Sequence, residues 1–370
     1  MNVLEKAKIT NAQSILLFIV VVSSTGILFL PTIVYEIAKR DTWLTMVLVG
    51  FLGTVVAYII TKLGLMFKDK TIIQYSEIIL GKVPGKIVGL IYCAYFIHLD
   101  AIGIREFSEL LVGPFFPGTP ILFFTIAIML VSIYAVYSGI EVIARVNEFI
   151  FPLFMIAISG IIFLSIKDMD FNNFLPILEG GWMPVIKGTY HEIYFISEMV
   201  FLLMLIPYIN KQEKVQKSVF TGVILLALLG MVVFGGIGAV FGAALVNRIN
   251  YPFLALARYV SIGDVATRIE SLVMFMWVSG VFIKITILHY CAVLAVSQWL
   301  NLKVYKPLVI PIGAIMVVLS MIIAGNVVEL GELLSKILIP YLIIEIGIPF
   351  ILLIVALLRK KGSRKPMNNA

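Results

Sequence analysis

The side chains most able to do chemistry in this sequence are charged groups inside long apolar runs, and Lys284 is the first of them. It lies about 13 residues, or roughly 20 Å, from Ser271 at one end of its run and a similar distance from Leu300 at the other. A lysine stem cannot reach water across that distance, so its ammonium must face carboxylates, carbonyls or enclosed water. We expect Lys284 to act in ion coupling, in place of a bound sodium ion or as a proton carrier, or else to pair structurally with a buried acid.

Glu198 is a carboxylate at comparable depth, in the run Met183–Ile209. It lies roughly 16–22 Å from either end of that run, where a carboxylate must be protonated, paired or hydrated. We interpret Glu198 as a binding, gating or coupling residue, with a structural ion pair as the alternative. His191 and Glu192 lie one to two turns nearer the end of the run and are weaker candidates for the same role.

Hydroxyl residues, a glycine and a proline interrupt the apolar run Ser14–Ile37. Pro31 lacks an N–H, and Gly26 adds backbone freedom, so this composition predicts a break in the first helix. A broken helix at membrane depth survives only where it is buried in protein or lines a wet cavity, and many transporters bind their substrates there. The alternative is a kinked helix of no special role. The candidate ligand-binding residues of this stretch are Ser23, Ser24, Thr25, Gly26 and Ile27.

The third apolar run adds weaker candidates. Asp100 and His98 lie deep in Gly85–Val112, and Asp100 either takes part in ion coupling or pairs with Lys284 or another cation. Tyr95, about one turn before His98, is a candidate wall of a binding site, although a lone aromatic on a membrane helix is more often a packing residue.

Composition decides the class of protein. Hydrophobic residues make up 61% of the 370 residues and charged residues 13%, against roughly 45–50% and about 25% in soluble domains. We therefore expect an all-α polytopic membrane protein. The runs give ten spans: Ala12–Ala38, Trp43–Met66, Gly85–Val112, Ile121–Tyr137, Phe149–Ile166, Met183–Ile209, Val219–Leu245, Ser271–Leu300, Leu308–Ala324 and Ile337–Leu358, with an interfacial helix in Asn250–Ile262.

Charge in the loops predicts the orientation. About eighteen Lys and Arg residues fall in loops on one side, including those of the tail 359–370, and about eight on the other. Positive loops stay in the cytoplasm, so both termini are expected there. The same rule explains the net charge of +7 without a nucleic-acid partner. We find no nucleotide-binding or metal-binding motif, and expect no enzyme activity, no cofactor and no metal.

Ten spans also divide into two five-helix halves, 1–166 and 183–358, in which the sixth span would repeat the first in opposite orientation. Like the first, the sixth has a polar interruption, Tyr194–Glu198, followed by Pro207, although it has no glycine there. In such a pair of inverted halves the eighth span lies beside the first, which would bring Lys284 against carbonyls freed at Ser23–Gly26.

Several short motifs have the order and spacing of one family. They are Ile9–Gln13 and Gly26–Pro31 in the first span, Trp43 after Asp41, Gly139–Arg145, Glu198 with Pro207, Arg268–Leu272, Trp277 and Phe282–Lys284. In these residues, over essentially its whole length, the chain resembles the B subunit of the nutrient (germinant) receptors of endospore-forming bacteria. This is the spore germination permease family of the amino acid–polyamine–organocation superfamily.

The resemblance implies a ten-helix fold of two inverted five-helix repeats, like that of amino-acid permeases and LeuT, with broken first and sixth helices. It implies a ligand site between those helices, walled by the third and eighth. An amino acid there would find N–H groups for its carboxylate at a half-helix N-terminus, and freed carbonyls and Glu198 for its ammonium. Carried over, the site comprises Ser24 to Leu28, then Phe195, Ile196, Ser197 and Glu198, and Thr286 or its neighbours.

The resemblance also implies a function. It is that of a nutrient-sensing subunit, which binds a small molecule such as an amino acid and signals to a membrane A subunit and a lipoprotein C subunit in the inner membrane of the spore. The alternative is a proton-coupled amino-acid permease, with Lys284 or Glu198 carrying the coupling. A structural or channel-forming subunit, the third class, would bind no ligand saturably.

Overall fold

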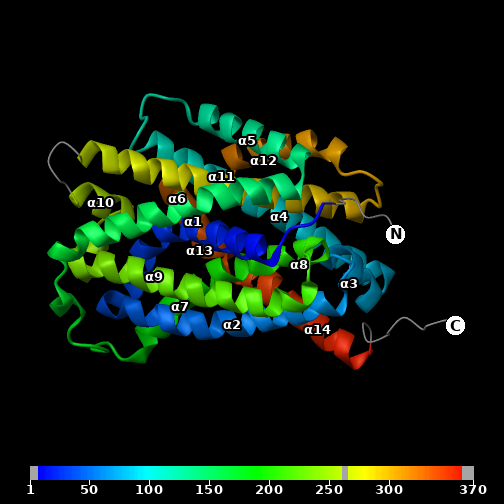
Figure 1. The fold of residues 1–370 in the computed structure, drawn as a ribbon, viewed down its shortest axis with the longest axis horizontal. Helices are drawn as coiled ribbons and strands as arrows, with labels where there is room; N and C mark the ends of the chain where they lie inside the picture. Colours follow the sequence, from blue (N-terminus) through cyan, green and yellow to red (C-terminus); the bar gives the residue numbers. More distant parts are fainter. Residues whose placement is uncertain (1–6, 261–265, 361–370) are drawn as a thin grey trace.

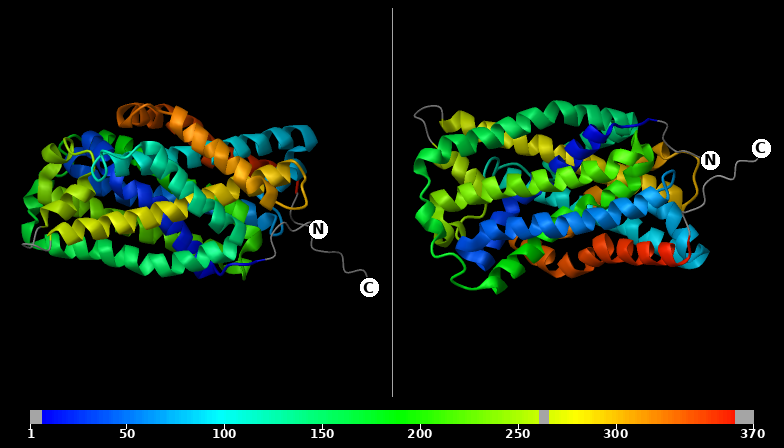
Figure 2. Two further views of the ribbon diagram at one scale, coloured as in Figure 1. Left: turned by 90° about the horizontal axis from the view of Figure 1, so that it is seen from above. Right: turned by 60° about the horizontal axis from the view of Figure 1, so that its bottom comes forward.

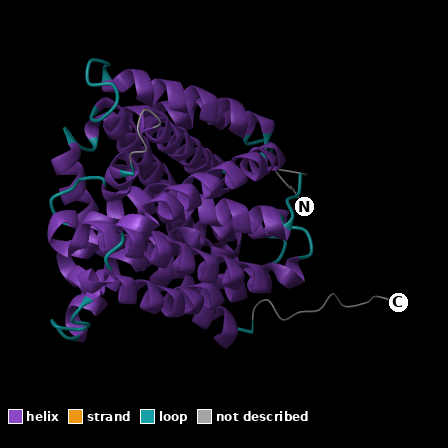
Figure 3. Ribbon diagram, turned by 60° about the vertical axis from the view of Figure 1, so that its left-hand side comes forward, coloured by secondary structure: helices purple, strands orange, loops and turns teal. Residues whose placement is uncertain are grey.

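The computed structural model describes residues 7–260 and 266–360, with the side chains of 266–270 and 272 left out, and this part of the chain is almost entirely helical (Figure 3). The helices are α1 (Asn11–Ala38), α2 (Thr42–Met66), α3 (Ile72–Leu80), α4 (Lys82–Val112), α5 (Ile121–Ser138), α6 (Ile140–Ser165), α7 (Trp182–Ser197), α8 (Leu202–Leu205), α9 (Val215–Val246), α10 (Pro252–Tyr259), α11 (Ala266–Trp299), α12 (Val309–Ile322), α13 (Val327–Leu342) and α14 (Ile348–Leu358).

Eight helical stretches of the described residues are long and apolar enough to cross a membrane. One of them, Asn11–Met66, covers the first two predicted spans, because only the 3-10 turn Lys39–Asp41 separates α1 from α2. The ninth predicted span lies in the shorter apolar helix Lys306–Ile322. All ten predicted spans are therefore helical in the structure, and the chain is an integral membrane protein.

The first span differs from its prediction. α1 runs as one helix through Ser23–Gly26, with Pro31 inside it. The hydroxyls of Ser23 and Ser24 donate to carbonyls three or four residues earlier in the same helix, at 3.3 Å for Ser24 and 2.6 Å for Ser23. They therefore satisfy the helix from within rather than interrupt it. The expected broken first helix, with its freed carbonyls and half-helix N-terminus, is wrong.

The sixth span is interrupted where the sequence predicts. α7 ends at Ser197, and Glu198–Phe201 continues as a 3-10 helix before the short α8 and a second 3-10 turn, Ile206–Tyr208. A 3-10 stretch inside a helix often marks a hinge or a strained sequence. The change of helix type falls at Glu198 even though no glycine is present.

Backbone hydrogen bonds join the start of the first span to the end of the sixth. Ile9, just before α1, donates to the carbonyl of Tyr208 at 2.8 Å, and its own carbonyl accepts from Asn210 at 2.8 Å. Thr10 and Gln13 then form a capping box that starts α1. The start of the first span and the end of the sixth thus lie at the same end of the bundle, as two inverted halves require.

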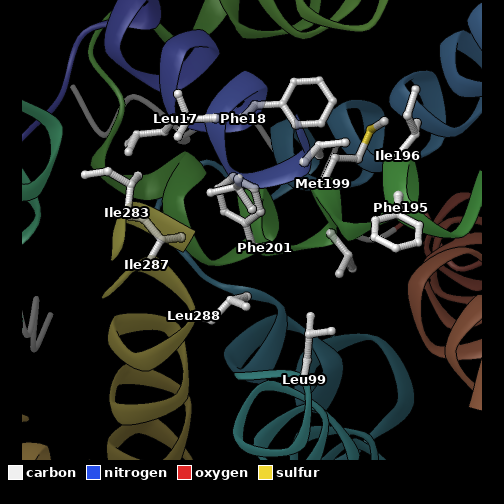
Figure 4. Packing of buried hydrophobic residues seen from close by; sticks show 14 of the residues in the cluster. Leu17, Phe18, Leu99, Phe195, Ile196, Met199, Phe201, Ile283, Ile287 and Leu288 are labelled. Carbon is white, nitrogen blue, oxygen red and sulfur yellow. The ribbon is translucent and has the colours of Figure 1, made fainter. Parts of the chain in front are cut away.

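The middle of the bundle is formed by α1, α4, α7 and α11 (Figures 1 and 2). Leu17 and Phe18 of α1, Leu99 of α4, Phe195 of α7 and Ile287 of α11 lie in one buried apolar cluster there (Figure 4). By contrast, α5 and α6 carry exposed large apolar side chains, as expected of helices that face lipid. This packing places the deep charges of α11 and of the sixth span in the protein interior.

Some predictions fall partly outside the described residues. The predicted segment Asn250–Ile262 contains α10, but its last two residues are outside, as are 361–370 of the basic tail. The side chain of Arg268 in the family motif is also outside. Figure 1 shows the described chain entering α1 and leaving α14 at the same end of the bundle. The assignment of that end to the cytoplasm stays a prediction.

Candidate functional site

Lys284, on the eighth span, is bonded to side chains of the first and sixth spans. The residue is 2% exposed, and its ammonium donates to Glu198 Oε1 on the sixth span at 2.8 Å and to Thr25 Oγ1 on α1 at 2.8 Å. It also lies 5.7 Å from the ring centroid of Phe195, within cation–π range. The predicted neighbourhood of the eighth and first spans is therefore found, but the partner on α1 is a side-chain hydroxyl instead of a freed carbonyl.

The pair between Lys284 and Glu198 is almost fully withdrawn from solvent, with side-chain exposures of 3% and 1%. Desolvating two charges is expensive, and their attraction offsets that cost only when the geometry is good and other hydrogen bonds are made. Lys284 has the second bond to Thr25, whereas Glu198 Oε2 has no hydrogen-bond partner among the described residues. The acid therefore keeps an acceptor that a ligand or a water molecule can use.

A cavity of about 50 Å³ lies beside this pair, between α1, α2, α7 and α9. Five of the predicted ligand-binding residues line it, namely Ser23, Gly26, Ile27, Phe195 and Ile196. Its other lining residues are apolar or glycine except for Glu192, which is 2% exposed. Phe195 thus belongs both to the wall of the cavity and to the surroundings of Lys284.

A second buried acid lies next to the interruption of the sixth span. Glu345 is in the short π-helical turn Ile343–Gly347, between α13 and α14. It accepts from the hydroxyl of Tyr95 at 2.6 Å and from that of Ser197, the residue directly before Glu198. Turns of this kind are frequent at functional sites. The last span is thereby bonded to the sixth at the point where the helix type changes.

His98 and Tyr95 both face α13. His98 Nδ1 contacts the hydroxyl of Tyr341, and the Tyr341 ring lies edge-on to that of Tyr95 with centroids 5.1 Å apart. No hydrogen bond of the described residues joins either side chain to Lys284. Within the predicted site, these two residues and Ser197 therefore belong to a group around Glu345 and Tyr341, which is adjacent to the ion pair because Ser197 directly precedes Glu198.

Asp100 and Thr286 are completely buried, and among the described residues neither Asp100 oxygen nor the Thr286 hydroxyl has a hydrogen-bond partner. The suggested pairing of Asp100 with Lys284 is wrong, because that ammonium bonds to Glu198 and Thr25. Buried polar atoms without a partner call for an explanation such as a bound water or ligand. Both residues therefore stay candidates; among the described residues, no hydrogen bond or salt bridge joins them to the ion pair.

Removal of the Tyr95 hydroxyl tests the Glu345 group. Tyr95→Phe leaves one carboxyl oxygen of Glu345 without its 2.6 Å donor and should lower the free energy of unfolding by about 1–3 kcal/mol. The measurement is the midpoint of thermal unfolding of the purified protein in one detergent. Tyr134→Phe, at a side chain 76% exposed, is the matched control; equal midpoints for the two variants would contradict the assigned bond.

Two acids gain importance from the structure. Glu345 is visible in the sequence as an intramembrane acid between Pro340 and Pro349, but nothing in the sequence assigns it a partner. Glu192 ranks below Glu198 by depth alone, yet it is Glu192 that lines the cavity. The signal for both is an acid within an apolar run; what each acid faces depends on tertiary packing.

The chain matches the family model described as "Spore germination protein" over residues 8–328. The chain belongs to this family. Among curated relatives, spore germination protein YndE of Bacillus subtilis (strain 168) is 30% identical over 367 residues, which is 97% of this chain and 99% of the relative. Spore germination protein KB of the same organism is 27% identical over 371 residues, 98% of each chain.

Solved structures show the same fold in transporters. Mhp1, a nucleobase-cation-symport-1 family transporter with bromovinylhydantoin bound, aligns with a TM-score of 0.76 at 11% identity, covering 98% of this chain and 81% of its own. MhsT in complex with L-phenylalanine aligns with a TM-score of 0.65 at 13% identity, covering 96% and 99%. The predicted LeuT-like fold is thus confirmed.

Proposed function

We propose that this chain is the nutrient-sensing subunit of a spore germination receptor, and that it binds a small molecule, most simply an amino acid, between α1 and the sixth span. The observation that carries the proposal is the buried pair of Lys284 and Glu198, formed where the sixth span changes helix type and beside a cavity. Membership of the spore germination family supports the role in germination.

The charges of the site suit an amino acid. A zwitterion needs one partner of each sign; Lys284 provides the positive one, and the buried carboxylates of Glu198 and Glu192 are the negative ones available. Since α1 is not broken, the positive partner of the ligand carboxylate is the ammonium of Lys284 and not a helix end. Ser23, Ser24, Thr25, Gly26, Ile27, Phe195 and Ser197 form the remainder of the proposed site.

Binding must change the protein for a signal to pass. A ligand that competes for Lys284 or Glu198 alters the bonds among α1, the sixth span and α11, and shifts the bundle toward the arrangement for which it has the higher affinity. In our proposal the A subunit and the lipoprotein C subunit read that change at the inner membrane of the spore, with both termini of this chain on the core side.

The test is a thermal-unfolding screen of the purified chain against amino acids, sugars and nucleosides. A ligand that binds only the folded protein raises its unfolding midpoint, by an amount equivalent to about 2.7 kcal/mol at a hundredfold excess over Kd. We expect small amino acids to stabilise the protein and the other classes to have no effect. Stabilisation by sugars or nucleosides alone, or by nothing, would contradict the proposal.

A proton-coupled amino-acid permease is the second candidate. It is favoured by the buried acceptors of Asp100 and Glu198 that lack partners among the described residues, since such groups can exchange protons. The two candidates differ in whether the amino acid crosses the membrane. Accumulation of labelled amino acid in proteoliposomes that contain this chain alone would favour the permease, whereas saturable binding without uptake favours the sensor.

A further inference from the structure

Glu192 lines the cavity and carries a buried carboxylate oxygen that has no hydrogen-bond partner among the described residues. The residue is 2% exposed, and its Oε1 accepts from the hydroxyl of Thr45 at 2.7 Å. Its Oε2 is buried without a hydrogen-bond partner among the described residues. A buried carboxylate with one hydrogen bond is poorly compensated, so the site gains most from a group that brings both a positive charge and N–H donors.

The described lining of the cavity limits which cation can enter. Only Ser23 and Glu192 among the lining residues carry a side-chain oxygen, and none of them is Lys, Arg or His. Hard metal ions take about six or more oxygen ligands, which this wall cannot provide. The remaining wall is formed by apolar side chains and glycines, including Ile27, Leu30 and Phe195. These surroundings fit a cation with an apolar body.

The volume of the cavity limits the size of the apolar part of the cation. A water molecule needs roughly 10–15 Å³ of such space, so a cavity of about 50 Å³ holds roughly four non-hydrogen atoms. A primary ammonium with about three carbons fits this volume. L-Alanine has the same nitrogen and three carbons, and its two carboxylate oxygens must lie outside the cavity. The hydroxyl of Ser23, which donates to the carbonyl of Ile19 at 2.6 Å, keeps its oxygen lone pairs available as a second acceptor for the ammonium.

We propose that the cavity is a binding site for small primary amines, with Glu192 as the counterion of the ammonium and Ser23 as its second acceptor. This inference rests on the proposed function and deepens it: Glu192, and not Glu198, recognises the amino group of the nutrient. Glu198 is held by Lys284 and is not part of the cavity wall. The wall itself has no cation, so the carboxylate of an amino acid would lie outside the cavity, toward Lys284, whose ammonium is 5.7 Å from the ring centroid of Phe195 in that wall.

The experiment measures thermal stabilisation of the purified full-length chain, relative to buffer alone, by n-propylamine, propionate, 1-propanol and L-alanine, with NaCl at the ionic strength of the charged ligands as a control. We expect n-propylamine and L-alanine to stabilise the protein, and propionate, 1-propanol and NaCl to leave the midpoint unchanged. These ligands test the proposal on the wild-type protein, without any substitution.

Glu192→Gln removes the charge and keeps an acceptor for Thr45, so the fold is retained. Loss of one partner of a buried charged pair should raise the Kd for n-propylamine at least about thirtyfold. Glu332→Gln, at an exposed acid of α13, should leave it unchanged.

Each result has a definite meaning. Equal affinity of wild type and Glu192→Gln for n-propylamine would overturn the role of Glu192. Stabilisation by L-alanine but not by n-propylamine would overturn the amine class and leave the proposed function standing. Stabilisation by NaCl that disappears in Glu192→Gln would mean a metal cation and overturn the inference. Stabilisation by neither n-propylamine nor L-alanine would overturn the proposed function and this inference together.

Discussion

Lys284→Met should lower the free energy of unfolding by about 3–5 kcal/mol, because it leaves the carboxylate of Glu198 buried without its partner. The ammonium of Lys284 lies 2.8 Å from both Glu198 Oε1 and Thr25 Oγ1, and both side chains of the pair are almost fully buried. Methionine replaces the apolar stem of lysine at similar length, so loss of packing adds little. The measurement is the unfolding midpoint of the purified protein in one detergent.

The double variant Lys284→Met with Glu198→Met is the informative companion. Replacing a whole buried pair by apolar residues of similar volume is often neutral or stabilising, so most of the lost stability should return. Lys336→Met, in an exposed pair with Glu332, is the control and should cost less than about 1 kcal/mol. A single Lys284 variant as stable as the control would contradict the buried ion pair.

Gly26→Ala should make the unliganded protein more stable and its ligand binding weaker. Its new methyl group would lie 3.6 Å from Leu30 and 3.8 Å from Phe195, which is ordinary contact, and it enters the cavity. Alanine stabilises a helix interior by about 0.5–1 kcal/mol relative to glycine. Crowding a ligand in the same cavity costs about 1–3 kcal/mol of binding free energy, which is roughly five- to 150-fold in Kd. Midpoints with and without L-alanine measure both effects.

Gly331→Ala provides the comparison, because it lies inside α13 with no neighbouring atom within 4 Å of the added Cβ. It should show a similar gain in helix stability without a change in ligand affinity. If Gly26→Ala bound L-alanine as tightly as Gly331→Ala, the cavity at α1 would not be the ligand site.

The depth of Lys284 and Glu198 could be predicted from sequence, because helical rise converts residue number directly into distance from the membrane surface. The inverted arrangement of two halves also predicted that Lys284 lies against the first span, but it did not predict the bond between Lys284 and Glu198. The break of the first helix was predicted wrongly for a local reason: the hydroxyls of Ser23 and Ser24 bond back into their own helix. Composition therefore indicated polar atoms inside the span but not where their hydrogen bonds go.

The partners of the other acids could not be predicted. Glu345 bonds to Tyr95, 250 residues earlier, and Glu192 bonds to Thr45, 147 residues earlier. Such pairs depend on how rotated helices pack, and hydrophobic periodicity is weak in spans that are apolar on all sides. The sequence thus indicated which residues belong in the interior, and only the packing separates the Glu345 group from the cavity and the ion pair.

The most direct test of the proposed site is the position of a bound ligand in a structure of the purified chain solved with L-alanine. We expect the amino and methyl groups of L-alanine in the cavity lined by Ser23, Phe195 and Glu192, with the amino group toward Glu192 and the carboxylate outside the cavity, toward Lys284. Ligand density elsewhere in the protein, with this cavity empty, would contradict it.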